Sequence, residues 1–137
     1  MYGTWSKIMN NAIPLFISSI SAGFPSPADD YIEQRLNLND LLIPHKEATF
    51  FLRVQGDSMI GQGIHHGDLL IVDRSLNTAS KKIIIAVLDG ELLVKQLYIQ
   101  KNKVFLLAAN PNYKTIAITS EQNFQIWGVV TAVIHSF

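Results

Sequence analysis

The stretch IIIAVLDGELLVKQLY, residues 83–98, decides the fold of this chain. Two apolar runs rich in strand-forming residues flank Asp89-Gly90, a pair that favours the type I′ turn between antiparallel strands. The sequence therefore predicts a β-hairpin with strands at residues 83–88 and 91–98.

Further strand-like segments lie on both sides of this hairpin, separated by short turns that contain Gly, Asp, Asn or Pro. They cover residues 49–54, 68–72, 103–108, 115–119 and 124–134. Many short strands with tight turns and little helix are typical of a compact all-β domain. We therefore predict a mostly β fold, in which residues 29–137 form a folded-over β domain.

The N-terminal part of the sequence differs, because the first 44 residues hold four of the five prolines. Proline removes a backbone donor and fixes φ, so such a segment resists sheet formation. We expect an extended arm at residues 1–28, followed by one or two short helical turns within residues 31–42. The apolar run at residues 12–20 is shorter than a membrane span of about 20 residues, so no membrane association is expected.

Composition narrows the classes of function. Eleven basic residues balance eleven acidic ones, which argues against a DNA-binding surface that neutralises phosphates. The absence of cysteine excludes disulfides and thiolate metal sites, and suits a cytoplasmic protein. No nucleotide-binding loop is present, and neither a cofactor nor a metal is expected. His65 and His66 are adjacent while His45 and His135 are isolated, so all four are interpreted as surface residues.

Lys95 is the first candidate for chemistry. It lies on the second strand of the hairpin, and alternation places it on one face with Leu93 and Leu97. If that face is buried, the pKa of the lysine falls and the side chain becomes a general base near neutral pH. If the lysine instead points into solvent, it protects an edge strand from aggregation, and from spacing alone this is the more common arrangement.

Ser58 is the second candidate, in Gly56-Asp57-Ser58-Met59 directly after a predicted strand. A sharp turn there would expose its hydroxyl, and the backbone N–H groups of Asp57 and Ser58 could stabilise an oxyanion. Gly-Asp-Ser is also ordinary turn composition. A serine beside an uncharged lysine can hydrolyse peptides, so the chain is a peptidase if Ser58 and Lys95 meet in space.

A substrate for such a pair lies within the chain itself. Ala22 is small enough for a tight pocket, and Gly23 lets the backbone approach a nucleophile closely. From composition alone, a flexible turn before the Pro-rich segment is the simpler interpretation of this step.

Together these features resemble the LexA/UmuD family of Ser-Lys self-cleaving proteins, most closely its UmuD-type members, over residues 14–133. The most specific matches are AGFPSPADDYIEQR (22–35), GDSMI (56–60), GDLLIVD (67–73) and DGELLVK (89–95). The resemblance implies a LexA C-terminal-like fold. It also implies that Ser58 is the nucleophile, that Lys95 is the general base, and that Ala22-Gly23 is the scissile bond.

The resemblance also implies a biological role. Cleavage would be stimulated by the RecA filament on single-stranded DNA during the SOS response. The shortened product would form a homodimer and join the catalytic subunit of DNA polymerase V in error-prone translesion synthesis. Only 21 residues precede Ala22, too few for the helix-turn-helix domain of LexA-type repressors, so sequence-specific DNA binding is not expected.

The sequence departs from the family at three places. Alanine precedes the scissile glycine where UmuD-type proteins commonly have cysteine, Lys81-Lys82 replaces a Gly-Asp pair, and His65-His66 replaces acidic or polar residues. Two other classes remain as alternatives. One is a type I signal peptidase-like enzyme. The other is a non-catalytic, repressor-like module for binding and dimerisation.

Overall fold

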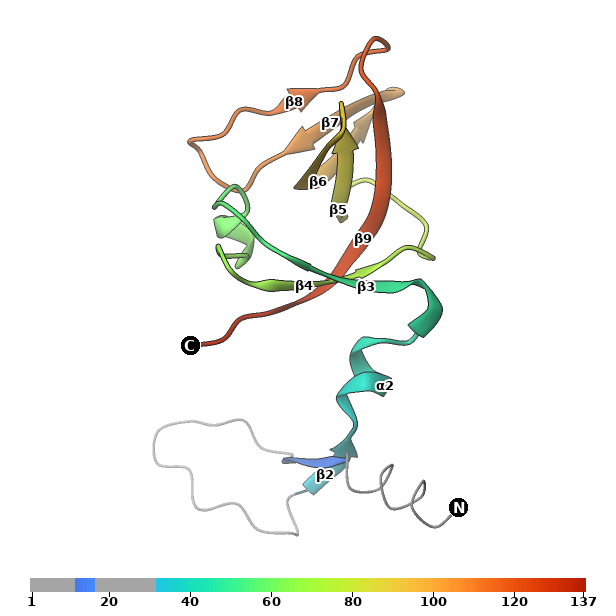
Figure 1. Cartoon of the computed structure of the whole chain (residues 1–137), viewed down its shortest axis with the longest axis vertical. Coiled ribbons are helices and arrows are strands. Elements are labelled where there is room, and N and C mark those ends of the chain that lie inside the picture. The colour runs from blue at the N-terminus through green and yellow to red at the C-terminus, as the bar shows by residue number, and fades with distance from the viewer. Residues whose placement is uncertain (1–11, 17–31) are drawn as a thin grey trace. The chain divides into compact units, whose positions relative to one another are not determined.

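A computed structural model describes residues 12–16 and 32–137 of the chain (Figure 1). The chain divides into two compact units between Pro44 and His45. Of the arm expected at residues 1–28, only residues 12–16 are described, and its expected boundary with the β domain lies outside the described residues.

The first unit contains a two-stranded antiparallel ribbon, β1 (Ile13–Phe16) and β2 (Ile32–Leu36), followed by the short helix α2 (Leu38–Leu42). Asn37 caps this helix, since its side chain accepts a hydrogen bond from the Asn39 N–H group at 2.9 Å. The helical turn expected within residues 31–42 is therefore present, but only after residue 37. Residues 32–36 instead pair with β1, whose Pro14 is tolerated because both strands of a ribbon are edges.

The second unit contains a seven-stranded sheet in the order β3-β4-β9-β5-β6-β7-β8, in which all neighbouring strands are antiparallel. The strands are β3 (Thr49–Arg53), β4 (Leu69–Asp73), β5 (Ile83–Leu88), β6 (Glu91–Gln100), β7 (Lys103–Leu107), β8 (Ile116–Ala117) and β9 (Phe124–Ile134). Two 3₁₀ turns, η2 (Lys46–Ala48) and η3 (Ile60–Gln62), complete the unit. The predicted mostly β fold is confirmed.

Strand β9 joins the two halves of this sheet. Its first half pairs with β5 and its second half with β4, while Val129 is opposite both Ile84 and Asp73. Figure 1 shows β9 running between the β3–β4 pair and strands β5 to β7. A glycine is needed at this crossing, because a Cβ on Gly128 would lie 2.6 Å from Val72 Cγ1.

The hairpin that the sequence predicts is present with its turn. Leu88 is opposite Glu91, and both Asp89 (φ 50°) and Gly90 (φ 84°) adopt the positive φ of a type I′ turn. Strand β6 pairs with β5 on one side and with β7 on the other. The β6–β7 ladder begins at Gln96, so Lys95 pairs with β5 and lies just before the part of β6 that has a strand on both sides.

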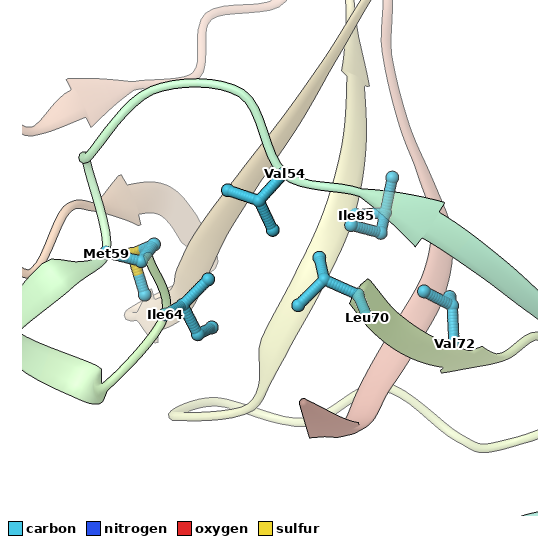
Figure 2. Packing of buried hydrophobic residues seen from close by; sticks show 6 residues of the cluster. All are labelled: Val54, Met59, Ile64, Leu70, Val72 and Ile85. Atoms are coloured by element: carbon cyan, nitrogen blue, oxygen red, sulfur yellow. The ribbon is translucent and has the colours of Figure 1, made fainter. Parts of the chain in front are cut away.

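A hydrophobic cluster extends beneath the loop that follows β3. Figure 2 shows its six buried members, Val54, Met59, Ile64, Leu70, Val72 and Ile85. Met59 and Ile64 flank η3, and full burial of such a side chain contributes about 1.5–3 kcal/mol. Packing therefore fixes the loop that carries Ser58.

Candidate active site

Ser58 lies in a turn that is held from both ends. Gly56 has φ 90°, a conformation that favours glycine, and Met59 beside Ser58 is only 1% exposed. The Ser58 carbonyl accepts a hydrogen bond from the Ala109 N–H group at 2.8 Å, and Gly61 donates its N–H to the Ala109 carbonyl at 2.7 Å. These two bonds tie the turn to the segment that follows β7.

Asp57, the residue before Ser58, is held by the same segment. Tyr113 donates its hydroxyl to Asp57 Oδ1 at 2.7 Å, and the Asn110 side chain donates to the Asp57 carbonyl at 3.0 Å. The hydrogen bond to the Asp57 carboxylate raises the pKa of Tyr113, because loss of the phenolic proton would place two negative charges together. Tyr113 therefore remains a donor to this carboxylate at neutral pH.

Lys95 is buried, with 6% of its surface exposed. It is opposite Ile84 in the β5–β6 ladder, and both Ile84 and Leu97 are fully buried. Burial lowers the pKa of Lys95 because it disfavours the ammonium form. The interpretation of Lys95 as a solvent-facing edge lysine is thus wrong, since its side chain is buried even though the β6–β7 ladder begins only at Gln96.

The Tyr113 ring connects the two candidates. Lys95 Nζ lies 4.9 Å from the centre of this ring, whose hydroxyl is bonded to Asp57. The ring face attracts an ammonium group and so favours the charged form, whereas burial favours the neutral form. The pKa of Lys95 is lowered by burial.

Ser58 and Lys95 line one open pocket of about 530 Å³. Its walls are residues 52–58 after and within β3, residues 91–95 of β6, and Leu70, Ile85 and Tyr113. Within residues 12–16 and 32–137, the N–H groups of Asp57 and Ser58 donate no hydrogen bond. The pocket thus brings together a hydroxyl, a lysine with a lowered pKa and two available backbone donors. The Ala22-Gly23 step lies outside the described residues.

The sequence profile of the Peptidase S24-like family matches residues 14–131. The chain belongs to this family. It is 46% identical to protein SamA of Salmonella typhimurium over 127 residues, which are 93% of this chain and 88% of SamA. It is 42% identical to protein MucA of Escherichia coli over 122 residues, which are 88% of this chain and 83% of MucA.

A more distant match links the chain to repressors. It is 36% identical to the LexA repressor of Stenotrophomonas maltophilia over 118 residues, which are 86% of this chain but 56% of the repressor. Membership of the S24 family makes the chain a UmuD-like, autoproteolytic serine peptidase. The match to this family excludes the alternative of a type I signal peptidase-like enzyme. No helix in the described part of the chain is long and apolar enough to cross a membrane.

Two polar residues of this region were not expected from the sequence to belong to the site. Asn110 and Tyr113 lie between the predicted strands at residues 103–108 and 115–119, where the sequence predicts only a short turn. A tyrosine directly after a turn carries no signal of its own. Its role depends on the bonds between the β7–β8 connection and the loop after β3.

The substitution Gly61→Ala tests how strongly this connection positions Ser58. A Cβ at residue 61 would lie 2.7 Å from the Ala109 carbonyl oxygen, so the Gly61–Ala109 bond must lengthen or the turn must shift. A misplacement of about 1 Å can cost roughly 100-fold in rate, so we expect self-cleavage to slow by roughly tenfold or more. Gln62→Ala, an exposed change in the same turn, is the control and should cleave at the wild-type rate.

Cleavage is followed on denaturing gels and stability by thermal melting. A Gly61→Ala chain that cleaves as fast as wild type would show that the turn tolerates the added methyl group. The link to Ala109 would then not position Ser58.

Proposed function

We propose that the chain cuts its own peptide bond between Ala22 and Gly23, with Ser58 as the nucleophile and Lys95 as the general base. The observation that carries this proposal is a buried lysine with a lowered pKa that lines the same pocket as Ser58. A neutral amine can accept the proton of a serine hydroxyl, which activates the hydroxyl as a nucleophile.

The proposed reaction conserves protons at each step. Neutral Lys95 accepts the Ser58 proton at Nζ as Ser58 Oγ attacks the Ala22 carbonyl carbon. The N–H groups of Asp57 and Ser58 stabilise the oxyanion. The C–N bond then breaks, and Lys95 returns its proton to the Gly23 amine. Water hydrolyses the acyl-enzyme, with Lys95 again acting as the base.

Because Tyr113 holds the residue before the nucleophile and covers the base, it is proposed as a positioning residue. Its hydroxyl fixes Asp57 through the 2.7 Å hydrogen bond, and its ring lies over Lys95 Nζ. Neither the hydroxyl nor the ring of Tyr113 transfers a proton in the proposed reaction. Docking of the arm would further exclude water from Lys95.

This activity acts as a switch in a UmuD-like protein of SOS mutagenesis, the accessory subunit of a mutagenic polymerase. We propose that the RecA filament on single-stranded DNA stimulates the cleavage. The product that begins at Gly23 would form a homodimer and bind the catalytic subunit of DNA polymerase V in the cytoplasm. The relatedness to SamA and MucA supports this assignment.

The stimulation is tested by incubating the chain with RecA, an ATP analogue and single-stranded DNA. We expect faster release of the N-terminal fragment than in a reaction that lacks DNA. A chain that binds RecA filaments or polymerase but releases no fragment would support the non-catalytic binding module instead.

The pH dependence of self-cleavage separates the roles of Lys95 and Tyr113. Only neutral Lys95 can accept a proton, so the rate should rise with pH, with a midpoint below the ordinary lysine pKa of 10.5. Tyr113→Phe keeps the ring over Lys95 but removes the bond to Asp57. We therefore expect a plateau lowered by roughly five- to tenfold with an unchanged midpoint.

The rate is measured between about pH 7 and 11, a range that spans the ordinary lysine pKa. A midpoint that moves in Tyr113→Phe would show that the hydroxyl also affects the pKa of Lys95, which contradicts a role limited to positioning Asp57. A rate that falls with rising pH would contradict a lysine base.

A further inference from the structure

Asp68, at the start of β4, is a buried carboxylate outside the pocket of Ser58 and Lys95. It is 2% exposed. Its Oδ2 accepts the backbone N–H of His65 at 2.8 Å, and its Oδ1 lies 2.5 Å from His135 Nδ1. The backbone bond from His65 and the contact with His135 lower the pKa of Asp68, so the carboxylate is charged at neutral pH.

A second imidazole faces the same carboxylate. His65 Nδ1 lies 3.7 Å from Asp68 Oδ2, which is too long for a hydrogen bond. The rings of His65 and His135 are 5.1 Å apart between centres and tilted by 46°. One ligand atom from each of the three residues lies within 4.8 Å of the other two. The residues come from the loop after η3, from the start of β4 and from the segment after β9.

Asp73, at the other end of β4, is a second buried carboxylate, and its hydrogen-bond partners can be compared with those of Asp68. It is equally buried, and its partners are His45 Nδ1 at 2.6 Å and the N–H and hydroxyl of Ser75. That carboxylate uses one imidazole and one serine. At Asp68 each carboxylate oxygen already has a partner, the His65 backbone N–H or His135 Nδ1, so the His65 ring is an additional group at this site.

We propose that His65, Asp68 and His135 bind one divalent transition-metal cation of the class of Zn²⁺, Co²⁺ and Ni²⁺. Two imidazole nitrogens and one carboxylate oxygen are a ligand set that these ions accept. If both atoms bind one metal ion through bonds of about 2.0–2.2 Å, the distance between His135 Nδ1 and Asp68 Oδ1 must increase by about 1 Å. The proton between these two atoms leaves Nδ1 when the metal binds, and the coordinated neutral imidazole carries its proton on Nε2.

The surroundings define the character of this site. The side chains of His65 and His135 are 46% and 47% exposed, which leaves a coordination position open to water. Arg53 and His66 line the adjoining pocket together with Asp68 and His135. Arg53 Nη1 donates to the Gly67 carbonyl at 2.9 Å, and His66 Nδ1 accepts the Gly56 N–H at 3.0 Å. The nearby guanidinium weakens cation binding, so we expect micromolar rather than nanomolar affinity.

The site is tested by titrating the full-length chain with ZnCl₂ by calorimetry and with CoCl₂ by visible absorption. We expect one equivalent bound with a dissociation constant of about 10 µM or lower, and cobalt bands that indicate nitrogen and oxygen ligands. His65→Ala and His135→Ala should each weaken binding by roughly tenfold or more. His45→Ala is the matched control, since it removes a half-exposed histidine that also faces a buried aspartate.

His65→Gln and His135→Gln guard against loss of folding, since an amide can donate to Asp68 but is a poor ligand for these ions. Thermal melting without metal confirms that each variant is folded. Absence of binding by the wild-type chain at about 100 µM Zn²⁺ would overturn the proposal. Unchanged affinity in folded His65 and His135 variants, or an equal loss in His45→Ala, would overturn it as well.

Discussion

Replacing Lys95 with methionine is expected to abolish self-cleavage and to raise the thermal stability of the β domain. Methionine has a similar length but no base, and removal of a general base typically slows a reaction by about 10²–10⁴-fold. The stability gain has a separate origin. Burial lowers the pKa of Lys95 below its ordinary value of 10.5, so folding is penalised at neutral pH, where the unfolded chain keeps the ammonium in water.

The pH dependence of stability provides a second test, because the pKa of Lys95 differs between the folded and unfolded chain. The wild-type chain should gain stability relative to Lys95→Met as the pH rises from neutral through the lowered pKa toward 10.5. Gel time courses measure the cleavage, and melting curves at several pH values measure the stability.

Lys103→Met removes an exposed lysine on β7, so it is a suitable control and should change neither cleavage nor stability. Wild-type cleavage in Lys95→Met would contradict the assignment of the base. A melting temperature lowered by the substitution would contradict the energetic argument.

Replacing Ser58 with alanine is expected to abolish self-cleavage without destabilising the fold. Ser58 is half-buried, and its bond to Ala109 uses the backbone carbonyl, which alanine retains. Loss of the nucleophile removes the acyl-enzyme route, and in serine peptidases such losses reach about 10⁶-fold. Any residual cleavage should be independent of Lys95.

Ser120→Ala, an exposed change in a distant turn, is the control for Ser58→Ala. The two variants should melt within about 1–2 °C of wild type, since surface changes rarely exceed about 0.5 kcal/mol. If Ser58→Ala releases the fragment at the wild-type rate, another residue is the nucleophile.

The hairpin and β9 could be predicted closely from the sequence because local signals bound them. Strand β5 has the predicted limits, and so does β9. Strand β2 could not be predicted, because residues 32–36 form a strand only through pairing with the distant residues 13–16. Strand β8 is shorter than predicted, since only Ile116 and Ala117 reach β7.

The candidate site could be predicted only in part. Alternation places Lys95 on one face with Leu93 and Leu97, but the burial of Lys95 depends on segments that are distant in the sequence, such as that of Tyr113, whose ring centre lies 4.9 Å from Nζ. Tyr113 reaches this site, and His135 reaches the separate Asp68 cluster, through contacts between segments far apart in the chain. Such contacts leave no local pattern in a single sequence.

Intact mass spectrometry of the full-length chain incubated at alkaline pH tests the central claim most directly. The account predicts two products, one that ends at Ala22 and one that begins at Gly23, in the wild-type chain but in neither Ser58→Ala nor Lys95→Met. No cleavage, cleavage at a different bond, or the same products from either variant would contradict it.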